Sequence, residues 1–238
     1  MTRIFITRDG ARRPSQGPEC WKALLANPKT QWRPGFSAMA AARSWEAAQS
    51  APSGLPPEVA ALLGPEARLA TAEPEFKVPL PGRGGASQCD VFAMIDIGPR
   101  RIATAVEAKV EESFGPTLAA WTPDRSPGRG ARLAAILALL GAAAPPLALR
   151  YQLLHRSAAA ILEAQRRGAD AAAMLVQSFS PRHRRLEDFE AFCAWLGLPD
   201  PAPGRLMAHS LPCGRDLLLG WVSSGASTFL EPAPGREG

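Results

Sequence analysis

The sequence feature that most constrains the fold is a stretch from residue 87 to residue 115 that contains two apolar, strand-like runs. The runs are separated by Gly98 and Pro99, residue types that favour a tight turn, and basic residues follow the turn. A short turn between two strands joins them as antiparallel neighbours. We therefore predict a β-hairpin around Gly98 and Pro99, and we expect the rest of the chain to be arranged around it.

Three charged residues interrupt these apolar runs. Asp90 lies early in the first run, and Glu107 and Lys109 lie near the end of the second. Side chains two positions apart on a strand point to the same face, so Glu107 and Lys109 should project together, with Ala108 turned away. In a hairpin, Asp90 on the neighbouring strand can reach this pair. Two carboxylates and an ammonium group on one patch are sufficient for a hard metal ion and a water nucleophile.

A second acid-x-Lys tripeptide, formed by Glu75 and Lys77, competes with this assignment. Glu107 is preferred because it ends an apolar run, has Asp90 as a partner, and does not adjoin a proline-rich turn. An acid on a buried strand is costly without a cation or hydrogen bonds. The lysine also stands out, because the chain takes most of its cationic residues from arginine. A compact ammonium suits activation of water better than a guanidinium does.

Composition narrows the class of protein. A chain of 238 residues is long enough for one domain with a full core, and we predict a single domain over residues 1–230 with a disordered tail at 231–238. The net charge of +5 suits a polyanionic partner. The N-terminal segment lacks the pattern of a signal peptide, and no apolar run approaches the length of a membrane span. We expect a cytoplasmic bacterial protein that does not bind membranes.

The remaining pattern alternates helices and strands, which predicts an α/β fold with a mixed sheet flanked by helices. Strands are expected at 4–7, 75–80, 171–179 and 215–222, and helices near 19–26 and at 37–49, 56–64, 131–141, 147–168 and 186–198. The apolar run at 171–179 has the pattern of a buried parallel strand. An apolar stripe that begins at Leu147 is expected to face the core, and residues 116–130 are expected to be irregular.

The order of helix, three strands, helix and strand, with Asp90 on the second strand and Glu107-x-Lys109 on the third, resembles the restriction-endonuclease-like αβββαβ core of the PD-(D/E)xK nuclease superfamily. The resemblance covers about residues 37–180, and Cys89 stands where the motif has proline. The segments SQCDVF, VEAKVEESFGP and RYQLLHR also resemble an uncharacterised bacterial family that is grouped with these nucleases.

The resemblance implies roles for individual residues. Asp90 and Glu107, with the backbone carbonyl of Ala108, would be ligands of Mg²⁺ or Mn²⁺, and Lys109 would orient the attacking water. Glu46 occupies the position from which many members add a glutamate ligand, although it fits a solvated helix residue as well. The helix after the third strand would supply phosphate contacts, for which Gln152 and Arg156 are candidates. Arg101 and other arginines would attract the nucleic-acid backbone.

The sequence therefore predicts a Mg²⁺-dependent nuclease that acts on DNA or RNA, with DNA favoured and a homodimer compatible. Three alternatives stay open. The three charged residues could form a structural ion pair at a sheet edge. The fold could serve as a non-catalytic module that binds nucleic acid or a protein partner. The carboxylates could perform acid–base chemistry on a small molecule, which would require a closed apolar pocket in place of an open basic cleft.

Overall fold

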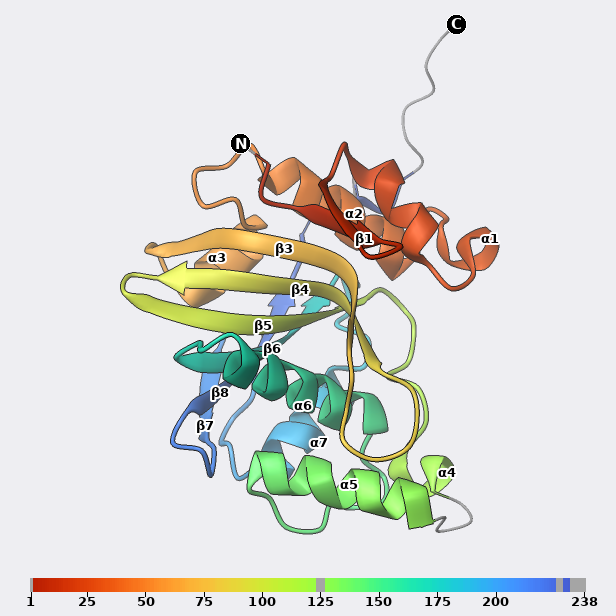
Figure 1. Ribbon diagram of the computed structural model, residues 1–238, viewed down its shortest axis with the longest axis vertical. Helices are drawn as coiled ribbons and strands as arrows, with labels where there is room; N and C mark the ends of the chain where they lie inside the picture. Colours follow the sequence, from red (N-terminus) through yellow and green to blue (C-terminus); the bar gives the residue numbers. More distant parts are fainter. Residues whose placement is uncertain (1, 123–126, 226–228, 232–238) are drawn as a thin grey trace, which may run out of the picture.

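The computed structural model describes residues 2–122, 127–225 and 229–231. Its main feature is a six-stranded mixed sheet with the strand order β3-β4-β5-β6-β8-β7 (Figure 1). The pairs β3-β4, β4-β5 and β7-β8 are antiparallel. The pairs β5-β6 and β6-β8 are parallel. A separate two-stranded hairpin, β1-β2, lies near the N-terminus. The α/β architecture with a mixed sheet is as the sequence predicts.

The strands of the main sheet are β3 (Ala67–Val78), β4 (Ser87–Ile97), β5 (Arg100–Lys109), β6 (Ala171–Ser178), β7 (Leu206–Ser210) and β8 (Asp216–Ser223), and the small hairpin consists of β1 (Phe5–Arg8) and β2 (Ala11–Pro14). The helices are η1 (Pro18–Leu24), α1 (Pro28–Gln31), α2 (Ser37–Ala48), α3 (Pro57–Leu63), α4 (Leu118–Trp121), α5 (Pro127–Leu140), α6 (Tyr151–Arg166) and α7 (Leu186–Trp195).

The central hairpin is formed by β4 and β5, as predicted. The two strands pair from Val91↔Val106 to Ile97↔Arg100, so Gly98 and Pro99 form a two-residue turn. Gly98 has a φ of 56°. This left-handed conformation is strained for other residues and is favoured at the first position of such turns.

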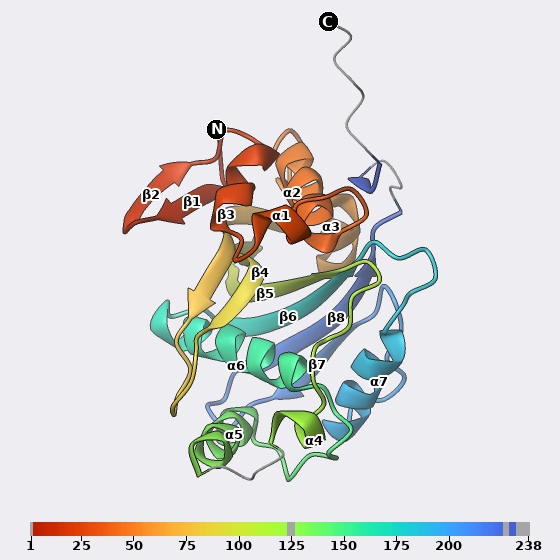
Figure 2. The same cartoon turned by 90° about the vertical axis from the view of Figure 1, so that its right-hand side faces the viewer.

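Helices cover both faces of the sheet (Figure 2). On one face, α2 and α3 pack on the sheet through residues such as Trp45 and Val59. On the other face, α5, α6 and α7 contribute Ile136, Leu154 and Phe189 to a second apolar cluster. All residues of β6 are buried, which confirms the prediction of a buried parallel strand at this position.

The sheet opens into a fork at one end of the central hairpin. Pairing between β4 and β5 ends at Val91↔Val106. Beyond this point β4 stays with β3 as far as Val78↔Ser87, while β5 stays with β6 as far as Lys109↔Ser178. In Figure 2, β3 and β4 accordingly diverge from the direction of β5 and β6. Asp90 and Glu107 are the first residues past the last β4-β5 pair, so they lie where the fork opens.

Several local expectations were wrong. Residues 118–121, expected to be irregular, form the short helix α4, and α5 begins at Pro127 instead of residue 131. Helix α6 begins at Tyr151 because residues 116–118 hydrogen-bond to residues 149–151, and Leu147 is consequently 63% exposed. The strand expected at 75–80 is the end of a longer strand that begins at Ala67. Strand β7 was not predicted. The expected tail, apart from Glu231, lies outside the described residues.

Candidate active site

Glu107 and Lys109 lie at the end of β5 with their side chains in direct contact. The Lys109 ammonium donates a hydrogen bond of 2.5 Å to Glu107 Oε1. Only 1% of Glu107 and 5% of Lys109 is exposed. Because Ala108 lies between them on a pleated strand, its side chain packs on the opposite face, among the apolar residues around Trp45. The sheet thus presents the two charged groups together, as the sequence spacing predicts.

Helix α6 adds two more groups to Glu107. Arg156 Nε donates to Glu107 Oε2 at 2.5 Å, and Gln152 Nε2 donates to Oε1 at 2.8 Å. Gln152 and Arg156 are four residues apart, so both face the same side of the helix. Burial raises the pKa of Glu107, but the charges and hydrogen bonds of Arg156 and Lys109 outweigh it and lower the pKa to about 2. Glu107 is therefore ionised at neutral pH and held by three donors.

Asp90 faces Glu107 and Lys109 across the fork. Its Oδ2 atom accepts a hydrogen bond of 2.7 Å from the backbone N–H of Ala108. A residue's N–H and carbonyl point to the same side of a strand, so the carbonyl of Ala108 also opens toward the fork. Burial, followed by the charges of Glu107 and Glu75, raises the pKa of Asp90 well above its ordinary value. The charges of Lys109 and Arg156 thus compensate Asp90 less than they compensate Glu107.

Glu75 is a third carboxylate at this site, and the sequence interpretation did not assign it a role. It lies on β3 between the pairs Pro74↔Val91 and Phe76↔Cys89, directly across from Asp90. Its φ of 53° is unusual for a glutamate inside a strand, and such strained positions are frequent at functional sites. Gln88 Nε2 donates a 2.5 Å hydrogen bond to Glu75 Oε2. Burial raises the pKa of Glu75 to about 7, against the opposing effect of the Gln88 bond.

The sequence contained one signal for Glu75, which is the second acid-x-Lys tripeptide. The structure separates its two members, because Lys77 is exposed and does not line the cavity into which Glu75 faces. The tripeptide therefore marked a relevant carboxylate, but for a reason unrelated to the lysine beside it.

These groups line a cavity of about 490 Å³ between the fork, the start of α6 and the segment that precedes α2. Glu112 joins that segment to β5, because its carboxylate accepts hydrogen bonds from the backbone N–H groups of Ser37 and Val110 at 2.9 and 2.7 Å. The charged residues around the cavity are Arg33, Glu75, Asp90, Glu107, Lys109, Glu112 and Arg156.

Glu46 does not belong to this site, contrary to its assignment as a metal ligand. Its carboxylate accepts hydrogen bonds from the Ser15 hydroxyl, from the Gln49 amide and, at 2.8 Å, from Trp21 Nε1. The reason is the rotation of α2, which directs Trp45 and not Glu46 toward the sheet, where Trp45 Nε1 bonds to Gln177 at 2.9 Å. Glu46 instead fixes the N-terminal segment to α2.

Arg101 is also remote from the site. It lies at the other end of β5, eight residues from Lys109, which corresponds to about 26 Å along a strand. Its guanidinium pairs with Asp96 at 2.7 Å. Arg101 therefore cannot contact a group bound in the cavity, although its exposed charge still contributes to the field around the protein.

A metal ion at the fork would need several oxygen donors around one point. Within the described ranges, no three His, Cys, Asp or Glu side chains are grouped closely enough to hold a metal ion. Both oxygens of Glu107 already accept hydrogen bonds. Asp90 and Glu75, whose pKa values are raised, are the carboxylates that a cation would stabilise. The donor chemistry thus suits a hard cation, provided that Glu107 exchanges one of its hydrogen bonds.

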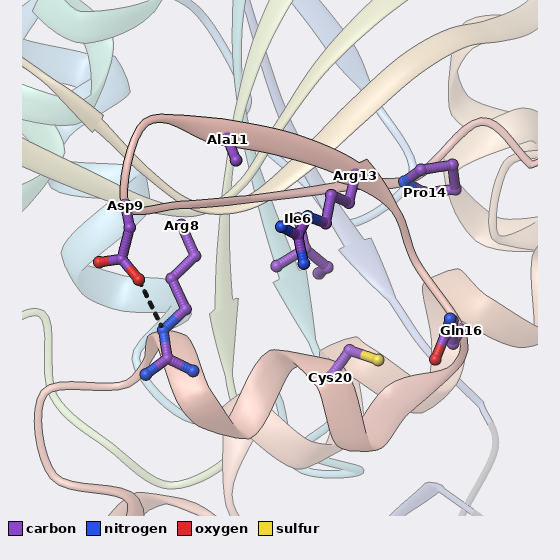
Figure 3. A pocket seen from close by; sticks show the side chains of 8 residues that line it. All are labelled: Ile6, Arg8, Asp9, Ala11, Arg13, Pro14, Gln16 and Cys20. Carbon is purple, nitrogen blue, oxygen red and sulfur yellow. Dashed lines mark ion pairs between the residues drawn. The ribbon is translucent and has the colours of Figure 1, made fainter.

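Another cavity lies beneath the β1-β2 hairpin, next to η1 (Figure 3). The charged residues that line it are Arg8, Asp9 and Arg13. Arg8 and Asp9 form a 3.6 Å ion pair with highly exposed side chains, and Cys20 on η1 is the one nucleophilic side chain drawn there. The described residues that line this cavity include no buried cluster of titratable groups, so it does not compete with the fork.

Together these features define a mixed α/β protein with a buried acid–base cluster at a fork in its sheet. The chain belongs to the family described as a domain of unknown function (DUF6946), which it matches over residues 14–226. Neither a curated protein nor a solved structure matches the chain. Among the helices of the described residues, none combines the length and apolar character needed to cross a membrane.

Proposed function

We propose that the protein is a metal-dependent nuclease of the PD-(D/E)xK type, with a restriction-endonuclease-like core. The observation that carries the proposal is the fork, which gathers Asp90, Glu107 and Lys109 in one cavity with Gln152 and Arg156. The element order α2-α3-β3-β4-β5-α4-α5-α6-β6 supports it, since it contains the αβββαβ series that the sequence resembles, with α3, α4 and α5 as additional helices.

In this proposal Asp90, Glu107 and the carbonyl of Ala108 would hold Mg²⁺ or Mn²⁺, and Glu75, in place of Glu46, is the further carboxylate that lines the same cavity. The metal would supply charge to offset the scissile phosphate and would lower the pKa of a bound water. Lys109 would orient the attacking water and offset the negative charge that it develops. These groups together would hydrolyse a phosphodiester bond.

Gln152 and Arg156 receive a different role from the one the sequence suggested. Both donate to Glu107, so they position that carboxylate instead of binding phosphate directly. Without Arg156, Glu107 would be a buried anion paired only with Lys109. A lysine that must neutralise the glutamate alone is less available to a water molecule. Arg156 is therefore a positioning residue in this mechanism.

The proposal includes nucleic acid as the partner, with DNA favoured, a cytoplasmic location and a homodimer as the compatible assembly. A non-catalytic module that binds nucleic acid or protein is the second candidate. One observation favours it: three donors already satisfy the carboxylate of Glu107. In that case the cluster would be a structural ion network.

A calorimetric titration with Mg²⁺ and Mn²⁺, followed by cleavage assays on plasmid and single-stranded DNA and RNA, separates the two candidates. Asp90→Asn should abolish both metal binding and cleavage. The matched control is Asp96→Asn, on the same strand but at the remote end, paired with Arg101. It should leave both properties unchanged. If folded wild-type protein neither binds metal nor cleaves, the catalytic proposal is wrong and the non-catalytic module becomes the better explanation.

A further inference from the structure

A basic cavity of about 330 Å³ lies beside the candidate active site. It is formed by the loop between β3 and β4, the end of α4 and the facing sides of α5 and α6. Arg83, Arg129 and Arg132 line it, and no aspartate or glutamate is among the described residues that line it. Three guanidinium groups around one recess favour the binding of an anion.

Arg132 is the informative member of this group, because it is only 5% exposed. Its Nη1 atom donates to the carbonyl of Gly85 at 2.7 Å, and Nη2 donates to Gly82 at 3.4 Å. Among the ion pairs of the described chain, none joins Arg132 to a carboxylate, and its Nε has no hydrogen-bond partner. Buried charges in proteins are normally paired, so this guanidinium lacks an anion.

The loop around Arg132 is built of glycines that allow a close approach. Gly82 and Gly84 have φ values of 81° and 133°. A Cβ atom at Gly84 would lie 3.0 Å from Cζ of Arg132, and one at Gly82 would lie 3.2 Å from its Cα. Side chains at these positions would press on the arginine more tightly than ordinary contacts do, and the positive φ values disfavour them as well. The sequence Gly82-Arg83-Gly84-Gly85 thus closes tightly on the guanidinium and adds a second cation.

Tyr151 places a hydroxyl in the same cavity, close to Arg132. Tyr151 is 8% exposed, and its hydroxyl group is buried without a hydrogen-bond partner. The ring is fixed by stacking on Trp121, with ring centroids 3.7 Å apart and an angle of 13° between the planes. A buried hydroxyl without a partner costs stability, and an acceptor bound in the cavity would remove that cost.

The basic cavity shares a wall with the candidate active site. Ser87 Oγ accepts a 2.9 Å hydrogen bond from Nη1 of Arg156 and lies 2.8 Å from Nδ1 of His155. Arg156 in turn binds Glu107 at 2.5 Å. Burial and the charge of Arg156 lower the pKa of His155 to about 3, so His155 is neutral and adds no charge to the wall. A group in the basic cavity therefore lies two side chains away from Glu107.

We propose that this basic cavity is a phosphate-binding subsite, in which Arg132, Arg83 and Tyr151 contact the oxygens of one phosphate group. Guanidinium groups and hydroxyls are the donors that phosphate prefers, and a buried arginine binds it more strongly than an exposed one. The phosphate could be inorganic, the terminal phosphate of a nucleic-acid strand, or an internal phosphodiester next to the scissile bond. The two strand-derived sources rest on the proposed nuclease function, whereas binding of inorganic phosphate does not.

The test uses the full chain in EDTA, so that nothing is cleaved. Inorganic phosphate is titrated by calorimetry into the wild type, Tyr151→Phe, Arg83→Gln and the control Arg100→Gln, an exposed arginine at the turn of the central hairpin. We expect saturable binding that is weakened about tenfold by Tyr151→Phe and by Arg83→Gln. Arg100→Gln should bind as the wild type does.

Tyr151→Phe is the decisive variant, because a hydroxyl with a purely structural role would affect stability and not phosphate binding. Removal of an unsatisfied hydroxyl should leave the stability of the protein unchanged or raised, so weaker phosphate binding cannot be attributed to unfolding. No saturable binding by the folded wild type, or equal weakening by Arg83→Gln and Arg100→Gln, would overturn the proposal.

Oligonucleotides with a 5′-phosphate, a 3′-phosphate or only hydroxyl ends then distinguish the sources. Tighter binding of one phosphorylated end that Tyr151→Phe removes identifies a terminal phosphate. Equal sensitivity of all three oligonucleotides to Tyr151→Phe identifies an internal phosphodiester. Phosphate binding by a protein that shows no metal-dependent cleavage would refute the nuclease proposal and leave the subsite standing, so the two failures are distinguishable.

Discussion

Glu75→Gln tests whether the buried negative charge of a carboxylate at the fork destabilises the folded protein. Burial raises the pKa of Glu75 from its ordinary value of 4.5 to about 7. The folded protein therefore holds a proton on Glu75 more tightly than the unfolded chain does. Stability from this group is complete below pH 4.5 and is lost as the pH rises to about 7. A neutral glutamine removes this dependence, because it has no proton to lose.

The magnitude follows from the size of the shift. About 2.5 pKa units at 1.36 kcal/mol per unit amount to about 3 kcal/mol of lost stability for the wild type above pH 7. At pH 8 we therefore expect Glu75→Gln to unfold at a higher urea concentration than the wild type. Its free energy of unfolding should be larger by up to about 3 kcal/mol. At pH 4.5 the two proteins should differ by less than about 1 kcal/mol.

The assay is urea denaturation followed by tryptophan fluorescence, in EDTA at both pH values, because a bound metal ion would stabilise the carboxylates. Glu66→Gln, an exposed glutamate outside the cavity, is the matched control and should change little at either pH. If Glu75→Gln destabilises the protein equally at pH 4.5 and pH 8, the carboxylate acts as an ordinary hydrogen-bond partner of Gln88 and the argument fails.

Three further perturbations have distinct expected outcomes. Lys109→Met should reduce metal-dependent cleavage at least about 10²-fold, whereas Lys77→Met, in the other acid-x-Lys tripeptide, should be as active as the wild type in the same plasmid assay. Arg156→Met should lower the free energy of unfolding by about 3–5 kcal/mol, measured in urea, because it removes one partner of the buried Glu107; a change below 1 kcal/mol would contradict the ion network. Glu46→Gln should cost about 1–3 kcal/mol of stability and leave Mg²⁺ affinity unchanged in calorimetry, and a loss of affinity would restore it to the ligand set.

The central hairpin and its charged patch could be predicted because the information is local. Gly98 and Pro99 fix the turn, and an alternation of two fixes which side chains share a face. Glu107 and Lys109 are two residues apart on one strand, and Asp90 lies on the adjacent strand. Their meeting needs no knowledge of the rest of the fold.

The other members of the site depend on long-range packing. The assignment of Glu46 failed because adjacent residues on a helix differ by about 100° in direction, and only contact with the sheet decides that Trp45 faces inward. Glu75 was set aside because its tripeptide adjoins a proline-rich turn, and neither the start of β3 at Ala67 nor a φ of 53° at Glu75 can be inferred from the sequence. Such breaks of local rules are expected where a site is built.

The two neighbouring cavities have opposite electrostatic demands, which is the strongest argument that they act together. At the fork, Glu75 and Asp90 have raised pKa values and would be stabilised by a cation. Across the shared wall, the buried guanidinium of Arg132 lacks an anion. In the proposed function, a metal ion and a nucleic-acid phosphate would supply these two charges in one complex. Their binding should therefore be reciprocal, with phosphate in the basic cavity raising Mg²⁺ affinity at the fork and Mg²⁺ raising phosphate affinity by the same factor.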